Sequence, residues 1–209
     1  MKSFISEDDI EQAICNRLSL PEYGWKRIEC DARVEAQDDV STTGRANPSE
    51  CILPDVFLAA LKRLNPQVEE GVLQGILRNF RKDYTATDMV ETNYKLYNQL
   101  RNGIKKPVRK NGKEDFDIVR LIDFDHPERN DFHCVNQMWI KGHYRYRRPD
   151  VLLFVNGLPV VFIELKNSTV KVEESYNKNL TSYRKDIPNN FCFHHISELS
   201  NGLQTKIGA

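Results

Sequence analysis

The sequence of 209 residues lacks any excess of charge, because 30 lysines and arginines are matched by 30 aspartates and glutamates. A chain without net charge has no overall attraction to nucleic acid, so a nucleic-acid surface requires local clusters of cations. Cysteine is sparse as well, and none of the five cysteines lies in a Cys-x-x-Cys pair. This pattern indicates neither a disulfide framework nor a zinc knuckle, and is typical of reduced thiols in the cytoplasm.

Long apolar runs are also missing. No window has the length of a membrane span, and Met1 leads into a polar segment rather than a signal peptide. We therefore expect a soluble, cytoplasmic protein without a membrane partner. The phosphate-binding pattern Gly-x-x-x-x-Gly-Lys-Ser/Thr is absent too, so we do not expect this chain itself to bind ATP in the P-loop manner.

The first half of the sequence has the periodicity of helices. Ser6 is a typical N-cap before three acidic residues, and Ile10, Ile14 and Leu18 then recur at helical spacing. Pro21 and Gly24 are expected to end this helix. Three more helices are predicted around residues 54–64, 72–80 and 89–100, and residues 33–49 are predicted to form a long polar loop.

After Gly103 the pattern changes to that of strands. Strands are predicted over residues 116–122, 132–140, 151–155 and 160–165, with a strand beginning at Phe191 after a polar helix over 173–184. Asn156-Gly157 lies between two apolar runs and is a strong hairpin signal. The sequence therefore predicts a single mixed α/β domain over residues 1–209, mainly helical to about residue 103 and sheet-rich from residue 104.

The residues that suggest chemistry lie on this hairpin. Glu164 and Lys166 are two residues apart, so they share one face of a strand. An acid within Val-Val-Phe-Ile-Glu-Leu is costly to bury without a partner, and a Mg²⁺ ion with a second carboxylate at Asp150 would supply one. Lys166 would then orient a water or offset charge on a phosphate.

The register of the hairpin decides whether the two acids can meet. A regular two-residue turn pairs Val155 with Leu158, and this register places Asp150 and Glu164 on opposite faces. A three-residue loop or a β-bulge places both on one face. An active site here therefore predicts one of these two irregularities. The alternative is a half-exposed hairpin on which Glu164 and Lys166 form a surface ion pair of little energetic value.

The sequence around these residues favours the interpretation as an active site. Residues 148–167 read RPDVLLFVNGLPVVFIELKN, which resembles the PD-(D/E)xK nuclease motif and the N-terminal signature of the R (motor) subunit of type I restriction enzymes. The resemblance covers nearly the whole chain. It includes the acidic first helix, Leu61 to Pro66, Leu121 to Phe124, Asn130 to Phe132, Val135-Asn136-Gln137 and Ser200-Asn201-Gly202.

This resemblance implies an α/β restriction-endonuclease-like core with a mixed β-sheet flanked by helices. It implies that Asp150, Glu164 and the backbone carbonyl of Leu165 hold Mg²⁺, for which Mn²⁺ can substitute, and that Lys166 is the catalytic lysine. An acid from the first helix often joins such sites, and Glu11 is the best match, although a solvated helix-surface glutamate is an equal alternative. Tyr183 matches the tyrosine of a Gln-x-x-x-Tyr element, in which Asn179 replaces the usual glutamine.

The implied activity is endonucleolytic cleavage of double-stranded DNA in defence against foreign DNA. The implied partners are the methyltransferase and specificity subunits of a type I complex. ATP would serve only the translocase domains of a longer chain, of which this sequence would be a fragment. Two other interpretations are a non-catalytic DNA-binding or docking module that kept the fold, and a stand-alone nuclease of the same superfamily.

A basic, aromatic stretch lies directly before Asp150. It interleaves Lys141, Arg145, Arg147 and Arg148 with His143, Tyr144 and Tyr146. The functional interpretation is contact with DNA phosphates next to the metal site, and the alternative is a solvated strand. Cys192, His194 and His195 fit no standard zinc spacing, and ordinary packing is predicted for them.

Overall fold

The computed structural model describes residues 5–84, 87–110, 113–172 and 179–208. Its centre is a six-stranded mixed sheet in the order β1-β4-β7-β8-β9-β10. The strands are β1 (Lys26–Glu29), β4 (Phe132–Asn136), β7 (Val151–Val155), β8 (Leu158–Leu165), β9 (Ile196–Ser200) and β10 (Thr205–Gly208). The β1–β4 and β8–β9 pairs are parallel and the other neighbours are antiparallel, so the predicted mixed sheet is confirmed.

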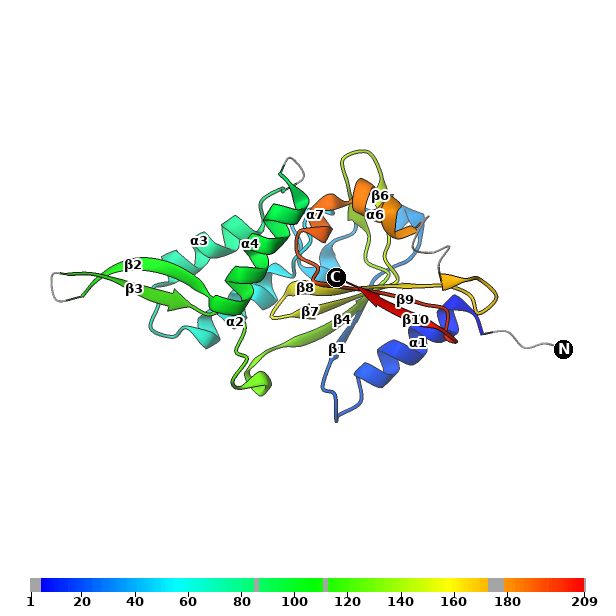
Figure 1. Ribbon diagram of the computed structural model, residues 1–209, viewed down its shortest axis with the longest axis horizontal. Helices are drawn as coiled ribbons and strands as arrows, with labels where there is room; N and C mark the ends of the chain where they lie inside the picture. The colour runs from blue at the N-terminus through cyan, green and yellow to red at the C-terminus, as the bar shows by residue number, and fades with distance from the viewer. Residues whose placement is uncertain (1–4, 85–86, 111–112, 173–178, 209) are drawn as a thin grey trace.

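Helices cover both faces of this sheet (Figure 1). Helix α1 (Glu7–Leu18) lies against one face, and α6 (Thr181–Asp186) and α7 (Pro188–Phe191) lie against the other. At one end, α2 (Pro54–Leu64), α3 (Glu70–Phe80) and α4 (Met89–Asn102) pack together. A two-stranded hairpin of β2 (Ile104–Lys110) and β3 (Lys113–Val119) extends from that end, and β5 (Ile140–Lys141) pairs with β6 (Tyr146–Arg147) above α6.

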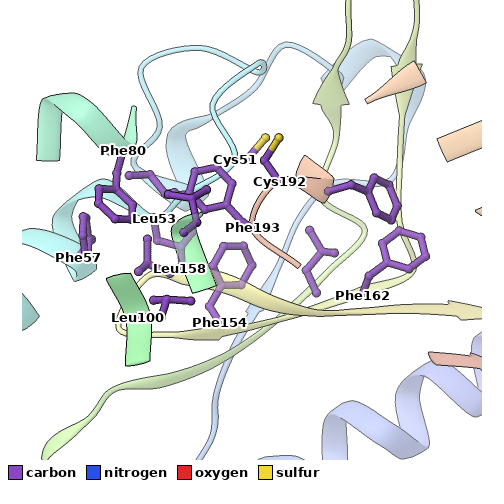
Figure 2. Close-up of a cluster of buried hydrophobic side chains, with 14 of the residues drawn as sticks. Cys51, Leu53, Phe57, Phe80, Leu100, Phe154, Leu158, Phe162, Cys192 and Phe193 are labelled. Carbon is purple, nitrogen blue, oxygen red and sulfur yellow. The ribbon is translucent and has the colours of Figure 1, made fainter. Parts of the chain in front are cut away.

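The alternation of apolar side chains along β7 divides the core into two parts. Val151 and Leu153 face α1, where they join Ile10 and Cys15. The opposite face is larger, and Figure 2 shows its aromatic and aliphatic side chains from the sheet and the helices in contact. Its buried members include Phe57, Phe80, Leu100, Phe154, Leu158, Phe162 and Phe193. Burial of each large apolar side chain contributes about 1.5–3 kcal/mol, so this layer holds the helices on the sheet.

The helical predictions agree well with the structure. Ser6 caps α1, where its side chain accepts a hydrogen bond from the Asp9 N–H and the Asp9 carboxylate accepts one in return. Pro54 occupies the first turn of α2, as expected, and residues 33–49 form turns with two short 3₁₀ helices, Val34–Ala36 and Ser41–Thr43. A third 3₁₀ helix covers Pro127–Arg129. No helix in the described part of the chain is long and apolar enough to cross a membrane.

Several strand predictions were wrong in detail. The strand predicted over 116–122 ends at Val119, and the one predicted over 132–140 is interrupted at Gln137, whose φ is 60°. The strand predicted from Phe191 is instead the end of helix α7, which starts at Pro188. Phe191 and Phe193 pack into the core from a helix and a turn. Tertiary packing therefore overrides the preference of these aromatic residues for strands. Strand β1 was not predicted, and residues 173–178 of the predicted polar helix lie outside the described residues.

Candidate active site

The β7–β8 hairpin contains the irregularity that an active site requires. Asn156 and Gly157 both have positive φ, 51° and 80°, as a two-residue type I′ turn needs, and Val155 pairs with Leu158. The register then shifts between Leu153 and Phe154, because Val160 is an extra residue on β8. This β-bulge confirms one of the two predicted irregularities.

The bulge aligns the two acids. Beyond it, Val151 pairs with Ile163, so the next positions along the register are Asp150 and Glu164. Both carboxylates therefore lie at the open end of the hairpin, on the face that carries Leu152 and Phe162. The fold thus places side by side two acids that a regular hairpin would separate.

The Glu164 carboxylate is buried and incompletely satisfied, and Asp150 is half-buried beside it. Glu164 is 3% exposed, and its Oε2 has no hydrogen-bond partner among the described residues. Asp150 Oδ2 accepts a hydrogen bond of 2.6 Å from the Leu165 N–H. Burial and the neighbouring Glu164 carboxylate raise the pKa of Asp150 to about 7, against the lowering effects of that N–H and of Lys166. Two carboxylates this close call for a cation between them.

Lys166 currently supplies the positive charge. Its Nζ lies 2.8 Å from Glu164 Oε1 and 2.6 Å from the carbonyl oxygen of Leu165. Burial lowers the pKa of Lys166, but the charge and hydrogen bond of Glu164 and the charge of Asp150 outweigh it, so the pKa lies above its usual value. The ammonium therefore stays charged and bonds two of the oxygens that are expected to bind a metal.

The donor set suits a hard divalent cation. Two carboxylates and one carbonyl oxygen are the ligand types that Mg²⁺ prefers, and the unpaired Glu164 Oε2 would gain a partner. Within the described residues, no group of three or more His, Cys, Asp and Glu side chains is arranged to hold a metal. A metal here would therefore rest on the Asp150–Glu164 pair and the Leu165 carbonyl rather than on a larger cage of side chains.

The residues matched to the Gln-x-x-x-Tyr element both reach this site. Asn179 Nδ2 donates a hydrogen bond of 2.9 Å to Glu164 Oε1, so the shorter amide does contact the carboxylate. The Tyr183 hydroxyl donates to the Arg148 carbonyl oxygen at 3.0 Å, and its ring lies 5.3 Å from that of Phe162. Burial and the carboxylates of Glu164 and Asp150 raise the pKa of Tyr183, so the hydroxyl remains protonated and serves as a donor.

Helix α1 brings a third acid, Glu11, to the same region. Glu11 is 4% exposed, and its carboxylate accepts hydrogen bonds from Asn136 Nδ2 at 2.8 Å and from Gln137 Nε2. It lines a cleft of about 700 Å³ together with Asp150, Gln137 and Arg148. The other acids of the cleft are Glu7, Asp8, Glu29 and Asp31. Sequence reasoning missed these four, because Glu7 and Asp8 also fit a helix-capping role and no local signal marks Glu29 or Asp31.

The sequence of the chain matches a known protein family. Residues 4–209 match the family described as Type I restriction enzyme R protein N terminus. The chain belongs to this family. The resemblance found in the sequence is therefore confirmed, and the mixed sheet flanked by helices fits a PD-(D/E)xK-like fold.

Two curated relatives share much of this R protein N terminus. It is 30% identical over 210 residues to the Type I restriction enzyme HindI endonuclease subunit of Haemophilus influenzae, an alignment that covers 98% of this chain and 19% of the relative. It is 32% identical over 173 residues to the putative type I restriction enzyme MjaIXP endonuclease subunit of Methanocaldococcus jannaschii, covering 79% of this chain and 16% of the relative. The chain thus spans less than a fifth of the length of these endonuclease subunits.

The basic stretch of this R protein N terminus divides into two pairs. Lys141 and Arg145 are exposed on the β5–β6 hairpin. Arg147 forms an ion pair with Asp186, and its guanidinium lies 5.3 Å from the centre of the Tyr183 ring. Arg148 stacks over Trp139 and donates a hydrogen bond to the Ala32 carbonyl at the cleft. The first pair is free to meet a polyanion, and the second helps build the cleft wall.

His194 and Cys192 belong to the core of the R protein N terminus, as predicted. Both are buried, and the His194 ring lies 5.8 Å from that of Phe162. Burial lowers the pKa of His194 to about 3, so the imidazole is neutral. These side chains fill space beneath β8 and take no part in the acidic site.

Proposed function

We propose that this chain is a Mg²⁺-dependent endonuclease domain that hydrolyses phosphodiester bonds of double-stranded DNA as part of a type I restriction enzyme. The observation that carries the proposal is the β-bulge, which aligns the half-buried Asp150 and the buried Glu164 beside Lys166. Membership of the R protein family and the names of its relatives, which are endonuclease subunits, support it.

Each residue of the site has a distinct role in this proposal. Asp150, Glu164 and the Leu165 carbonyl would hold Mg²⁺ or its substitute Mn²⁺, which supplies Lewis acidity at a phosphate and a more acidic bound water. Lys166, once released from Glu164, places an ammonium beside the attacking water and the phosphate oxygens. Asn179 restrains the Glu164 carboxylate through its amide donor.

DNA would approach along the β5–β6 hairpin. Lys141 and Arg145 are exposed there, and the stretch from residue 140 to residue 149 contains no acid to oppose phosphate. Such contacts position a duplex without reading its sequence. We propose that base recognition comes from a separate specificity subunit alongside a methyltransferase subunit, and that ATP acts only in translocase domains outside this sequence. The proposed setting is the cytoplasm.

The test begins with metal binding, because an isolated domain can bind metal without DNA being delivered to it. Titration calorimetry with Mn²⁺ would compare the wild-type chain with Asp150→Asn and Glu164→Ala. We expect binding by the wild type and at least a tenfold loss in both variants. Equal binding by all three proteins would place the metal elsewhere and overturn the proposed site.

Nicking of supercoiled plasmid in Mg²⁺ or Mn²⁺ would then test the chemistry. The wild type should nick DNA, and Glu164→Ala should reduce the rate by about 100-fold or more, the scale of losing a group that stabilises the transition state. Arg145→Ala should weaken DNA binding and reduce its salt dependence, since fewer counterions are released. DNA binding without metal binding or nicking would instead identify a non-catalytic module that kept the fold.

A further inference from the structure

Gln137 occupies an unusual backbone conformation next to the site. It follows β4, and its φ of 60° lies in the left-handed region, which disfavours residues other than glycine. Among the described residues, only Asn156 shares this property, and Asn156 lies in a tight turn that requires it. Gln137 belongs to no such turn, and conformations of this kind persist where surrounding contacts enforce them, often at functional sites.

The hydrogen bonds that hold Gln137 in its left-handed conformation are made to Asp150 and Glu11. The Gln137 N–H donates a hydrogen bond of 3.0 Å to the carbonyl oxygen of Asp150. Its side-chain Nε2 donates to Glu11 Oε2, and Nδ2 of the preceding Asn136 donates to Glu11 Oε1 at 2.8 Å. The left-handed bend thus lets two consecutive residues aim both amides at one carboxylate, while the main chain is tied to another acid.

The amides bond both oxygens of Glu11 without adding a charge. Glu11 is 4% exposed, and no ion pair to it is found among the described residues. Amide donors fix the orientation of a carboxylate without placing a competing cation on it. Asn136 is fully buried, and its Oδ1 has no hydrogen-bond partner in the described part of the chain. A buried polar atom without a partner is costly, which is unusual for a purely structural contact.

We propose that Gln137, together with Asn136, is a positioning residue that fixes the Glu11 carboxylate beside Asp150 in the metal-binding cleft. The proposal rests on the proposed function, because the metal gives this arrangement its purpose. Gln137 itself would not touch the metal or the DNA. It acts through Glu11 and through the main chain of Asp150.

Gln137→Gly separates this role from a structural one. Glycine accepts a φ of 60° without strain, so the variant removes the amide donor but preserves the bend. We expect its affinity for Mn²⁺, measured by titration calorimetry, to fall about tenfold or more, the scale typical of residues that orient metal ligands. Its midpoint of urea unfolding should change little, because the relief of backbone strain offsets the loss of the hydrogen bond to Glu11.

Gln67→Gly is the matched control. Gln67 is exposed in the turn between α2 and α3, outside the cleft, so this variant makes the same substitution without removing a donor to an acid. We expect its Mn²⁺ affinity to equal that of the wild type. A double-mutant cycle with Glu11→Ala completes the test: if Gln137 acts through Glu11, the double variant should bind Mn²⁺ no more weakly than Glu11→Ala alone.

The outcomes distinguish the two levels of the proposal. If wild type and Gln67→Gly bind Mn²⁺, Asp150→Asn does not, and Gln137→Gly binds as well as the wild type, the metal site stands and the positioning role is overturned. Full additivity with Glu11→Ala would also overturn it, since Gln137 would then act by another route. If the wild type itself binds no Mn²⁺, the proposed function and this role fail together.

Discussion

The two ends of the β7–β8 hairpin differ in whether their buried polar side chains have hydrogen-bond partners. At the turn, Asn156 is fully buried and its hydrogen-bonding groups are satisfied. Its N–H donates to the Asp131 carbonyl, its Oδ1 accepts from the Asp131 N–H and from Arg63, and its Nδ2 donates to the Leu121 carbonyl and to Asn130 Oδ1. At the open end, Glu164 is equally inaccessible, but its Oε2 lacks a partner among the described residues.

The difference indicates what each end is for. A satisfied buried network stabilises one conformation, whereas buried charges that are close together and incompletely paired cost stability and persist where function requires them. Both ends have a residue other than glycine with positive φ, Asn156 at the turn and Gln137 at the site. Backbone strain alone therefore does not distinguish the two ends, and the proposed active site rests on strain together with an unsatisfied acid.

Loss of the turn network should have the largest effect on stability. Asn156→Ala removes the side-chain hydrogen bonds to the Asp131 N–H and the Leu121 carbonyl. It also leaves an alanine at a φ of 51°, where no side-chain hydrogen bond compensates for the backbone strain. We expect the free energy of unfolding to fall by about 3 kcal/mol or more, measured by urea denaturation. Asn156→Gly, which relieves the strain but not the lost bonds, should recover roughly 1 kcal/mol.

The corresponding substitution at the open end is Gln137→Gly, which tests whether the two ends differ in stability. Gln137→Gly should change the free energy of unfolding by less than about 1 kcal/mol, because relief of strain offsets one lost hydrogen bond. A loss as large as that of Asn156→Gly would show that both ends are structural, and the distinction drawn between them would then be wrong.

The second prediction concerns the pH dependence of stability in the metal-free protein. The pKa of Asp150 is raised from an ordinary value near 3.8 to about 7, so between these pH values the folded state binds a proton that the unfolded state has released. The free energy of unfolding should therefore fall as pH rises from about 4 to 7. Asp150→Asn should remove this slope and be more stable than wild type at pH 8, by an amount on the order of a few kcal/mol.

Asp123, near the turn, provides the opposite control. Burial raises its pKa, but the hydrogen bond from the His126 N–H and the charge of Arg129 outweigh burial, so the pKa lies below its usual value. Its contribution to stability is present above pH 4 and is lost as pH falls further. Asp123→Asn should therefore destabilise the protein at pH 7. A stability curve for Asp150→Asn that parallels wild type from pH 4 to 8 would contradict the burial cost assigned to Asp150.

Much of this architecture could be predicted from local sequence signals. The Asn-Gly turn, the capped first helix and the apolar periodicity each reflect preferences of a few neighbouring residues. The irregularity in the hairpin was predictable as well, because Asp150 and Glu164 can share a face only if the register shifts. Glycine at 157 is also required by packing: a Cβ there would lie 2.6 Å from the Leu53 carbonyl oxygen.

The rest depends on contacts between distant parts of the chain. Neither the bend at Gln137 nor its bonds to Glu11 can be inferred locally, because they join residues 126 positions apart. The acids of the cleft come from α1, from β1 and from the loop after β1, and only tertiary packing brings them together. Phe191 was assigned to a strand for the same reason, since its place in the core is set by α7 and the sheet.

The smallest of the three predicted effects comes from competition between Lys166 and the proposed metal for the same oxygens. Lys166 Nζ bonds Glu164 Oε1 and the Leu165 carbonyl, two oxygens that the proposed metal also needs. Lys166→Met keeps an unbranched side chain but removes the competing cation, so we expect Mn²⁺ affinity at pH 8 to rise about tenfold, since a nearby charge is worth roughly 1 kcal/mol or more. DNA nicking should nevertheless be lost, because the ammonium beside the phosphate is gone.

Lys185→Met distinguishes local competition from a change in net charge. Lys185 is exposed on α6, so this variant removes the same charge without freeing Glu164. Its Mn²⁺ affinity should match wild type within about twofold, because exposed charges are screened by solvent and salt. Equal tightening in both variants would assign the effect to overall charge. Weaker binding by Lys166→Met alone would contradict this competition, and would show instead that the ammonium keeps the Glu164 carboxylate in the position that the metal needs.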